Sequence, residues 1–97
     1  GGMMDATDAS PEATGARELG EETGYEGTQA RRIGQVFPNP AIMSNVCYTV
    51  MFEDCRWVHP LQLDQGEDLI TRLVPVADVP RLVAEGKIRH CLVVAAL

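Results

Sequence analysis

Three glutamates, Glu18, Glu21 and Glu22, lie close together in the stretch ARELGEETGY, residues 16–25. On a helix, residues follow one another at about 100°, so Glu18 and Glu22 lie about one turn apart on one face and Glu21 falls beside them. Like charges at these spacings destabilise an isolated helix by roughly 0.2–0.5 kcal/mol per pair. The pattern therefore indicates a compensating cation, and carboxylate oxygens are the ligands that Mg²⁺ or Mn²⁺ prefers.

Arg17 is the basic residue beside these acids. It precedes Glu21 by four positions, so it can bridge to Glu21 along the helix or reach back to the loop before the helix. In either arrangement it would orient the acids without binding a metal itself. The plainer alternative is a solvated acidic face with a routine salt bridge, because charge runs are usually solvated.

The stretch RELGEETGY resembles the second half of the Nudix box, GX5EX7REUXEEXGU, in which U is an apolar residue. All the fixed places are matched, by Arg17, Glu18, Leu19, Glu21, Glu22, Gly24 and Tyr25. Upstream, GGMMD (residues 1–5) resembles the glycine-bearing loop that precedes the helix in this family. The later stretches NPAIMSN (39–45), LDQGEDLI (63–70) and LVPVADVPRLVAEGKI (73–88) resemble, more loosely, the branch of ADP-ribose and nucleoside-diphosphate-sugar pyrophosphatases.

This resemblance implies an enzyme that cleaves the pyrophosphate linkage of a nucleoside diphosphate derivative, by attack of water on phosphorus. It implies Mg²⁺ or Mn²⁺ as the cofactor, with Glu18 and Glu22 as the principal metal ligands and Glu21 as a further ligand or water contact. Such metals neutralise the charge of the diphosphate and lower the pKa of the attacking water. The implied fold is an α/β/α sandwich with a mixed sheet.

A general base is also required to deprotonate or position that water. Glu67, in DQGEDL, occupies the place of the loop glutamate that often has this role in the pyrophosphatase branch. Its neighbour Gly66 gives the loop flexibility to move toward the metals. Asp64 and Asp68 stay open as alternatives for the base, as does an ordinary acidic surface turn.

The match departs from the Nudix box at its first glutamate. Counting back from Arg17 places that glutamate at Ala9, whereas counting forward from Gly2 places it at Asp8. The carboxylate is therefore either missing, or replaced by Asp8 across a one-residue insertion. The strands that normally precede the box are also absent, so we expect residues 1–97 to form a single partial domain. Both departures favour an alternative function, a catalytically impaired Nudix-like module that binds nucleotide or a protein partner.

The composition narrows the class of protein. Residues 1–26 hold seven acidic residues against one basic residue, which disfavours nucleic acid as a partner and suits a divalent cation. No apolar run approaches the length that crosses a bilayer, and the first ten residues lack the pattern of a signal peptide. Three cysteines without CxxC spacing fit reduced thiols in the cytoplasm. A bare sheet edge would invite self-association, so we expect a homodimer.

The chain pattern predicts an α/β or α+β fold. The first expected element is a helix from Ser10 to about Thr23, with Ser10 as N-cap, Pro11 at the first helical position and Gly24 as the residue that ends it. Gly15 and Gly20 weaken this helix by roughly 1 kcal/mol each relative to alanine, so it requires tertiary packing. The further expected elements are strands at 28–37, at 46–52 as a central strand and at 69–76, and helices at 78–85 and from 90 onward.

Overall fold

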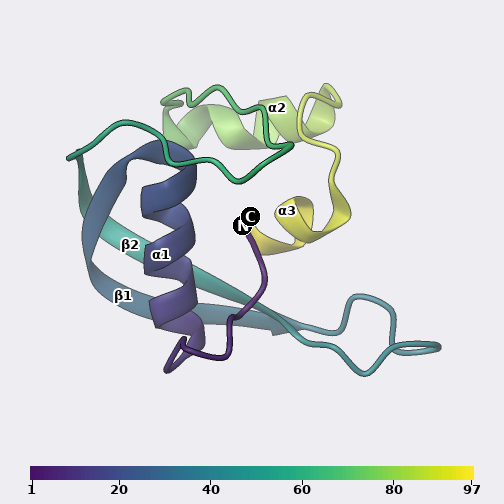
Figure 1. Ribbon diagram of the computed structural model, residues 1–97. Coiled ribbons are helices and arrows are strands. Elements are labelled where there is room, and N and C mark those ends of the chain that lie inside the picture. The colour runs from purple at the N-terminus through teal and green to yellow at the C-terminus, as the bar shows by residue number, and fades with distance from the viewer. The chain divides into compact units, whose positions relative to one another are not determined.

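The computed structural model describes all of residues 1–97, which form an α+β fold, as predicted from the sequence (Figure 1). The elements are α1 (Pro11–Thr23), β1 (Tyr25–Val36), β2 (Cys47–Trp57), the 3-10 turn η1 (Val76–Asp78), α2 (Val79–Ala84) and α3 (Cys91–Ala96). They belong to two compact units. The first comprises Gly1–Ile33 with Val50–Thr71, and the second comprises Gly34–Thr49 with Arg72–Leu97. None of the helices combines the length and the apolarity needed to cross a membrane.

Helix α1 begins and ends at the residues that the sequence indicates. The Ser10 side chain accepts a hydrogen bond of 3.1 Å from the Ala13 N–H, which satisfies one of the free donors at the helix start. Pro11 follows as the first helical residue. Gly24 takes a left-handed conformation, with φ of 75°, and its N–H donates to the Gly20 carbonyl at 2.8 Å. This conformation has almost no cost for glycine, so the helix ends there.

Other segments of the chain lie against α1 at the two glycines inside the helix. A Cβ on Gly15 would lie 3.3 Å from the Phe52 ring and 3.4 Å from Val50 Cβ, both on β2. A Cβ on Gly20 would lie 3.5 Å from the ring of His59. The loss of helix propensity at Gly15 therefore permits the close packing of β2, whereas a Cβ at Gly20 would make an ordinary contact.

Strands β1 and β2 are antiparallel and form a two-stranded sheet. The loop between them, residues 37–46, contains the Pro-Asn-Pro stretch that was expected to end the first strand. The prediction of a central strand at 46–52 is wrong, because β2 has β1 as its single neighbour. Apolar residues on both faces of a strand indicate that both faces can be buried; they do not set the number of neighbouring strands.

The strand predicted at 69–76 is also wrong. Residues 58–75 contain neither helix nor strand. A β-branched, apolar composition shows that side chains would fit a pleated surface, but a strand forms only where a partner edge offers hydrogen bonds. Here the Thr71 hydroxyl donates instead to the Glu22 carbonyl at 3.5 Å, so this segment is attached to α1.

In the second unit, the helices match the predicted positions with one difference in capping. Asp78 has helical backbone angles and makes no capping hydrogen bond; its carboxylate lies 3.8 Å from the Arg81 guanidinium. Gly86, with φ of 71°, follows α2 as the expected stop. His90 caps α3, because its Nδ1 accepts a hydrogen bond of 3.3 Å from the Leu92 N–H.

The hydrophobic core is thin. No apolar side chain is buried. Thr14 is a buried polar residue, at 6% exposure. Ala16 and Leu19 of α1 line a shallow hollow with Phe52 of β2. Large apolar side chains are exposed in both units, including Trp57 at 60% and Phe37 at 59%. Ion pairs and hydrogen bonds therefore carry much of the local organisation around α1.

Candidate functional site

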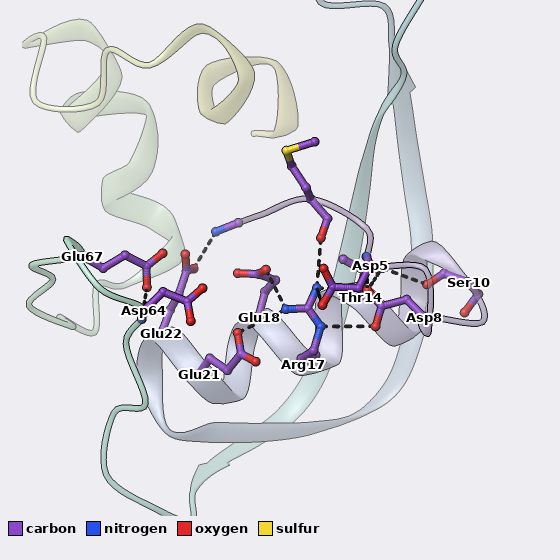
Figure 2. A network of polar contacts seen from close by, with 12 residues as sticks. Asp5, Asp8, Ser10, Thr14, Arg17, Glu18, Glu21, Glu22, Asp64 and Glu67 are labelled. Atoms are coloured by element: carbon purple, nitrogen blue, oxygen red, sulfur yellow. Dashed lines mark hydrogen bonds and ion pairs between the residues drawn. The ribbon is translucent and has the colours of Figure 1, made fainter.

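The Arg17 side chain is the centre of the polar network at α1 (Figure 2). Its Nε donates to Asp8 Oδ1 at 3.2 Å, and its Nη2 donates to Asp8 Oδ2 at 3.0 Å. The same Nη2 donates to the Met3 carbonyl at 3.0 Å. A planar guanidinium matches a carboxylate in this two-point manner, which fixes the orientation of both groups.

The Asp8 carboxylate accepts hydrogen bonds from three residues, Arg17, Asp5 and Thr14. The Asp5 backbone N–H donates at 2.8 Å and the Thr14 hydroxyl at 3.0 Å, and the Asp8 side chain is 9% exposed. The hydrogen bond from Arg17, followed by those from Asp5 and Thr14, lowers the pKa of Asp8 to about 2. Asp8 is therefore ionised at neutral pH, and its carboxylate is the one before α1 that makes a two-point contact with Arg17.

A tight turn before the helix brings the short Asp8 side chain to Arg17. The Asp8 N–H donates to the Asp5 carbonyl at 3.0 Å, while the Asp5 N–H donates back to the Asp8 carboxylate. Side chains of aspartate commonly close turns in this way. The one-residue insertion before Arg17 is thus part of a folded loop. Counting along the sequence could not choose between Ala9 and Asp8; the hydrogen bonds show that Asp8 contacts Arg17.

The remaining nitrogen of Arg17 faces the helix acids. Nη1 donates to Glu18 Oε1 at 3.0 Å and to Glu21 Oε2 at 3.2 Å. Arg17 thus does both things that the sequence left as alternatives, since it bridges along the helix and reaches back to the preceding loop. Its pKa is raised above the ordinary value, first by the hydrogen bond to Asp8 and further by the charges of Asp5 and Asp8.

The predicted metal ligands share one face of α1, and each is partly exposed: Glu18 at 14%, Glu21 at 29% and Glu22 at 18%. The Glu22 carboxylate accepts a hydrogen bond of 2.6 Å from the Gly1 amino group. The loop before the helix passes directly over Glu18, because a Cβ on Gly2 would overlap the Glu18 carboxylate. A larger residue at position 2 would therefore require the flexible end of the Glu18 side chain to shift.

The donor chemistry of this face fits a hard divalent cation, since three carboxylates project from one helical turn. Their oxygens do not converge, however: no three His, Cys, Asp or Glu side chains form a cluster with metal-binding geometry. Nitrogen donors of Arg17 and Gly1 contact these oxygens instead. A metal held here would require the carboxylates to turn from these nitrogens toward one another.

Glu67 lies on a loop that is attached to α1 at both ends. The Gln62 N–H donates to the Glu21 carbonyl at 2.8 Å, and the Thr71 hydroxyl donates to the Glu22 carbonyl. The loop therefore begins and ends at the last turn of the helix, beside the acidic face. Figure 2 shows Glu67 and Asp64 on the side of the helix where Glu22 lies.

Within this loop, the Glu67 carboxylate is bound by its own turn. It accepts a hydrogen bond of 2.9 Å from the Asp64 N–H, and the Glu67 N–H donates to the Asp64 carbonyl at 3.0 Å. Gly66, with φ of 90°, supplies the left-handed residue of the turn. Glu67 is thus near the helix acids but is not in contact with them, and its role as a base stays a prediction.

Gly24 holds the start of this segment against the helix. Its carbonyl accepts hydrogen bonds from the N–H groups of Val58, at 2.8 Å, and His59, at 3.3 Å. The added Cβ at Gly24 would overlap the His59 carbonyl and would lie 2.9 Å from Trp57 Nε1. The glycine of the REUXEEXGU pattern therefore serves two purposes, ending the helix and admitting residues 57–59.

Sequence reasoning missed two members of the network, the Thr14 hydroxyl and the Met3 carbonyl. Thr14 lies three positions before Arg17, so both share a helix face. That spacing is a usable signal for a hydroxyl that assists the arginine. The contact of Arg17 with the Met3 carbonyl could not be predicted from the residue type, because every residue has a backbone carbonyl.

Residues 1–93 match the NUDIX domain, and the chain therefore belongs to this family. A search among curated proteins gave no match. Nudix proteins as a family hydrolyse nucleoside diphosphates linked to another group, and they generally use divalent metals.

Proposed function

We propose that this protein is a divalent-metal-dependent hydrolase that cleaves the pyrophosphate linkage of ADP-ribose or another nucleotide sugar. The observation that carries this proposal is the arrangement of Glu18, Glu21 and Glu22 on one face of α1, with Arg17 bonded to two of them. In a merely solvated acidic face, Arg17 would have no need of the further ion pair that it makes with the nearly buried carboxylate of Asp8. The looser resemblance of residues 63–88 to the pyrophosphatase branch supports the nucleotide-sugar substrate.

In this proposal, Glu18 and Glu22 hold Mg²⁺ or Mn²⁺, with Glu21 as a further ligand or a contact to its water. A bound divalent ion would neutralise the diphosphate and acidify the attacking water. Arg17 positions Glu18 and Glu21 through its Nη1. Glu67 takes the proton from water, which requires it to leave the Asp64 N–H; the flexible backbone at Gly66 supports that movement.

One observation favours a second function, a module that binds nucleotide or a protein partner without hydrolysis. Oxygens of Glu18 and Glu21 contact the Arg17 guanidinium, and the three helix carboxylates do not converge on a common point. If these contacts persist when nucleotide binds, the diphosphate would be bound but not cleaved. The two functions therefore differ in turnover, which is directly measurable.

Incubation with ADP-ribose and Mg²⁺, followed by chromatography for AMP, separates the two functions. We expect AMP to form, and Glu22→Gln to slow its formation more than about 100-fold, beyond the 10–100-fold effect typical of residues that only support metal ligands. Glu85→Gln is the matched control, since Glu85 is exposed at the end of α2 and pairs with Arg81. AMP release that survives Glu22→Gln would remove the metal assignment, and ADP-ribose binding without turnover would establish the second function.

We also propose that residues 1–97 act as one domain, because the family match spans both compact units. A homodimer is part of the same proposal. Both strands of the two-stranded sheet have an open edge, and such edges pair readily with another chain. The free thiols of Cys47, Cys55 and Cys91 fit the reducing cytoplasm.

A further inference from the structure

We propose that the exposed end of β2, residues 54–57, pairs antiparallel with the same residues of a second copy of this chain, with Cys55 at the two-fold axis. This inference rests on the homodimer included in the proposed function, and it names the edge and the register of that dimer. The acidic face of α1 is not involved.

The end of β2 is open to solvent. Residues 47–53 of this strand are half-buried, whereas residues 54–57 are exposed. β1 lies along one edge of β2, and the other edge has no strand beside it. The change in burial coincides with Asp54, whose backbone is left-handed with φ of 49°. Such an angle interrupts a regular strand, so the exposed segment is set apart from the part of β2 that packs against Gly15 of α1.

Two oppositely charged side chains in this segment, Asp54 and Arg56, have no ion-pair partner within the chain. Both line a shallow hollow together with Glu26, so they share one face of the strand. The neighbouring ion pair joins Arg31 to Glu53 at 3.2 Å and uses neither of them. An exposed acid and an exposed base without partners are available to a strand that presents the opposite order of charges.

The order of these charges is complementary to itself. The strand reads acid, cysteine, base from Asp54 to Arg56, and an antiparallel copy presents base, cysteine, acid. With Cys55 at the axis, Asp54 faces Arg56 of the second copy and Arg56 faces Asp54 of the second copy. Directly opposite residues share a face, with Cβ atoms about 4.5–5.5 Å apart, so these charges attract. The two-fold axis forms each ion pair twice.

Other charges near this edge do not oppose the pairing. Trp57 would face Glu53 of the second copy, whose charge is already paired with Arg31. Glu26 lines the same hollow as Asp54, so it adds to the attraction for Arg56 of the second copy. Like charges therefore do not meet in this register.

The same features argue against an unrelated strand as the occupant. A bent edge with charged side chains resists pairing with other strands. Moving the two-fold axis by one residue, to Asp54 or to Arg56, would place like charges opposite each other, which destabilises a strand pair. The charges thus favour a second copy of this chain, and they favour one register.

A double-mutant cycle in dimer affinity tests this inference. Sedimentation equilibrium gives the dissociation constant of the dimer for the wild type, Asp54→Asn, Arg56→Glu and the double variant. We expect Arg56→Glu to weaken the dimer about tenfold or more, because each ion pair becomes a pair of facing acids. Asp54→Asn should weaken the wild-type dimer about threefold but tighten the Arg56→Glu dimer by a similar factor, since it removes that repulsion.

This change of sign separates specific ion pairs from the general repulsion between two acidic molecules. If only net charge mattered, Asp54→Asn would tighten both dimers. Asparagine also tolerates the left-handed backbone at this position. Arg72→Glu is the matched control, because Arg72 is an exposed arginine of the second unit without an ion pair. It should leave the dissociation constant unchanged within about twofold.

Cross-linking covers the case in which a charge variant fails to fold. The variant Cys47→Ser with Cys91→Ser keeps Cys55 as its single thiol, and this thiol is exposed. Opposite Cα atoms in an antiparallel pair lie about 4.5–5.5 Å apart, which suits a disulfide. Diamide should therefore link this variant into a dimer. The matched control keeps only Cys91, which is also exposed, and should give at least about fivefold less linked dimer.

Equal linkage through Cys55 and Cys91, or an Asp54→Asn effect of the same sign in both backgrounds, would overturn the inference. A dimer that Arg56→Glu leaves unchanged would also overturn it, and would assign the homodimer to another edge. A monomer at all concentrations would refute the homodimer and this inference together. Hydrolysis of ADP-ribose is measured separately, so none of these outcomes decides whether the protein is a hydrolase.

Discussion

Gly24→Ala should destabilise the protein more than an alanine substitution at a left-handed glycine normally does. An L-residue in this conformation costs roughly 1–2 kcal/mol. The new Cβ would also overlap the His59 carbonyl, displacing the segment whose Val58 and His59 N–H groups donate to Gly24. Each lost hydrogen bond costs about 1 kcal/mol. We therefore expect a loss of about 3–4 kcal/mol in the free energy of unfolding, a large share of the roughly 5–15 kcal/mol typical of domains.

Urea denaturation followed by the fluorescence of Trp57 measures this loss, because Trp57 is the one tryptophan and its Nε1 borders Gly24. Gly66→Ala is the matched control within the same compact unit. Gly66 is also left-handed, with φ of 90°, but a Cβ there would have no neighbour within 4 Å. We expect this control to lose only about 1–2 kcal/mol. Equal losses for the two variants, within about 0.5 kcal/mol, would refute the close packing of residues 57–59 on Gly24.

Three further predictions address the helix start, the acid range and the oligomeric state. Ser10→Ala removes the cap on the Ala13 N–H and should lower the free energy of unfolding by about 1 kcal/mol in urea denaturation; no change would contradict the cap. Because the pKa of Asp8 is lowered from 3.8 to about 2 on folding, its contribution is present above pH 4 and is lost as the pH falls toward 2. The melting temperature of the wild type should therefore fall more steeply over this range than that of Asp8→Asn, and parallel curves would contradict the Asp8 contacts. Analytical ultracentrifugation should give a dimer, whereas a monomer at all concentrations would exclude the proposed homodimer.

Helix α1 was predictable because its signals are local. Ser10, Pro11 and Gly24 act on backbone groups within one turn, so their effects do not depend on the rest of the fold. Gly86 marked the end of α2 in the same way, whereas Asp78, expected as its cap, makes no capping hydrogen bond. The strand expected at 69–76 failed because strand formation depends on a partner that the composition of one segment cannot supply.

The acidic face was predictable as a spacing, but its contacts were not. The sequence places Glu18, Glu21 and Glu22 together on any helix, and it offers Arg17 two directions. Arg17 contacts both the loop and the helix acids because the turn between Asp5 and Asp8 brings the Asp8 carboxylate to it. Counting residues back from Arg17 could not predict this turn. The roles of these residues as ligands, and of Glu67 as base, stay predictions.

The nearness of the Glu67 loop to the helix had no signal in residue type. It depends on the Gln62 backbone N–H and on the Thr71 hydroxyl, which bind the carbonyls of Glu21 and Glu22. Three of these four groups belong to the backbone, which is the same in every residue, and a single threonine is not a pattern that marks a tether. Resemblance singled out Glu67, and these hydrogen bonds bring its loop to the last turn of α1.

The central claim is that Glu18 and its neighbours bind a divalent cation used to cleave a diphosphate. Titration of Mg²⁺ into the wild type and Glu18→Gln at a fixed concentration of ADP-ribose, with AMP release as the signal, tests it most directly. We expect the rate to saturate with Mg²⁺ in the wild type, to vanish with excess chelator, and to require much more Mg²⁺ in Glu18→Gln. AMP release that persists in chelator, or an identical Mg²⁺ dependence in both proteins, would contradict it.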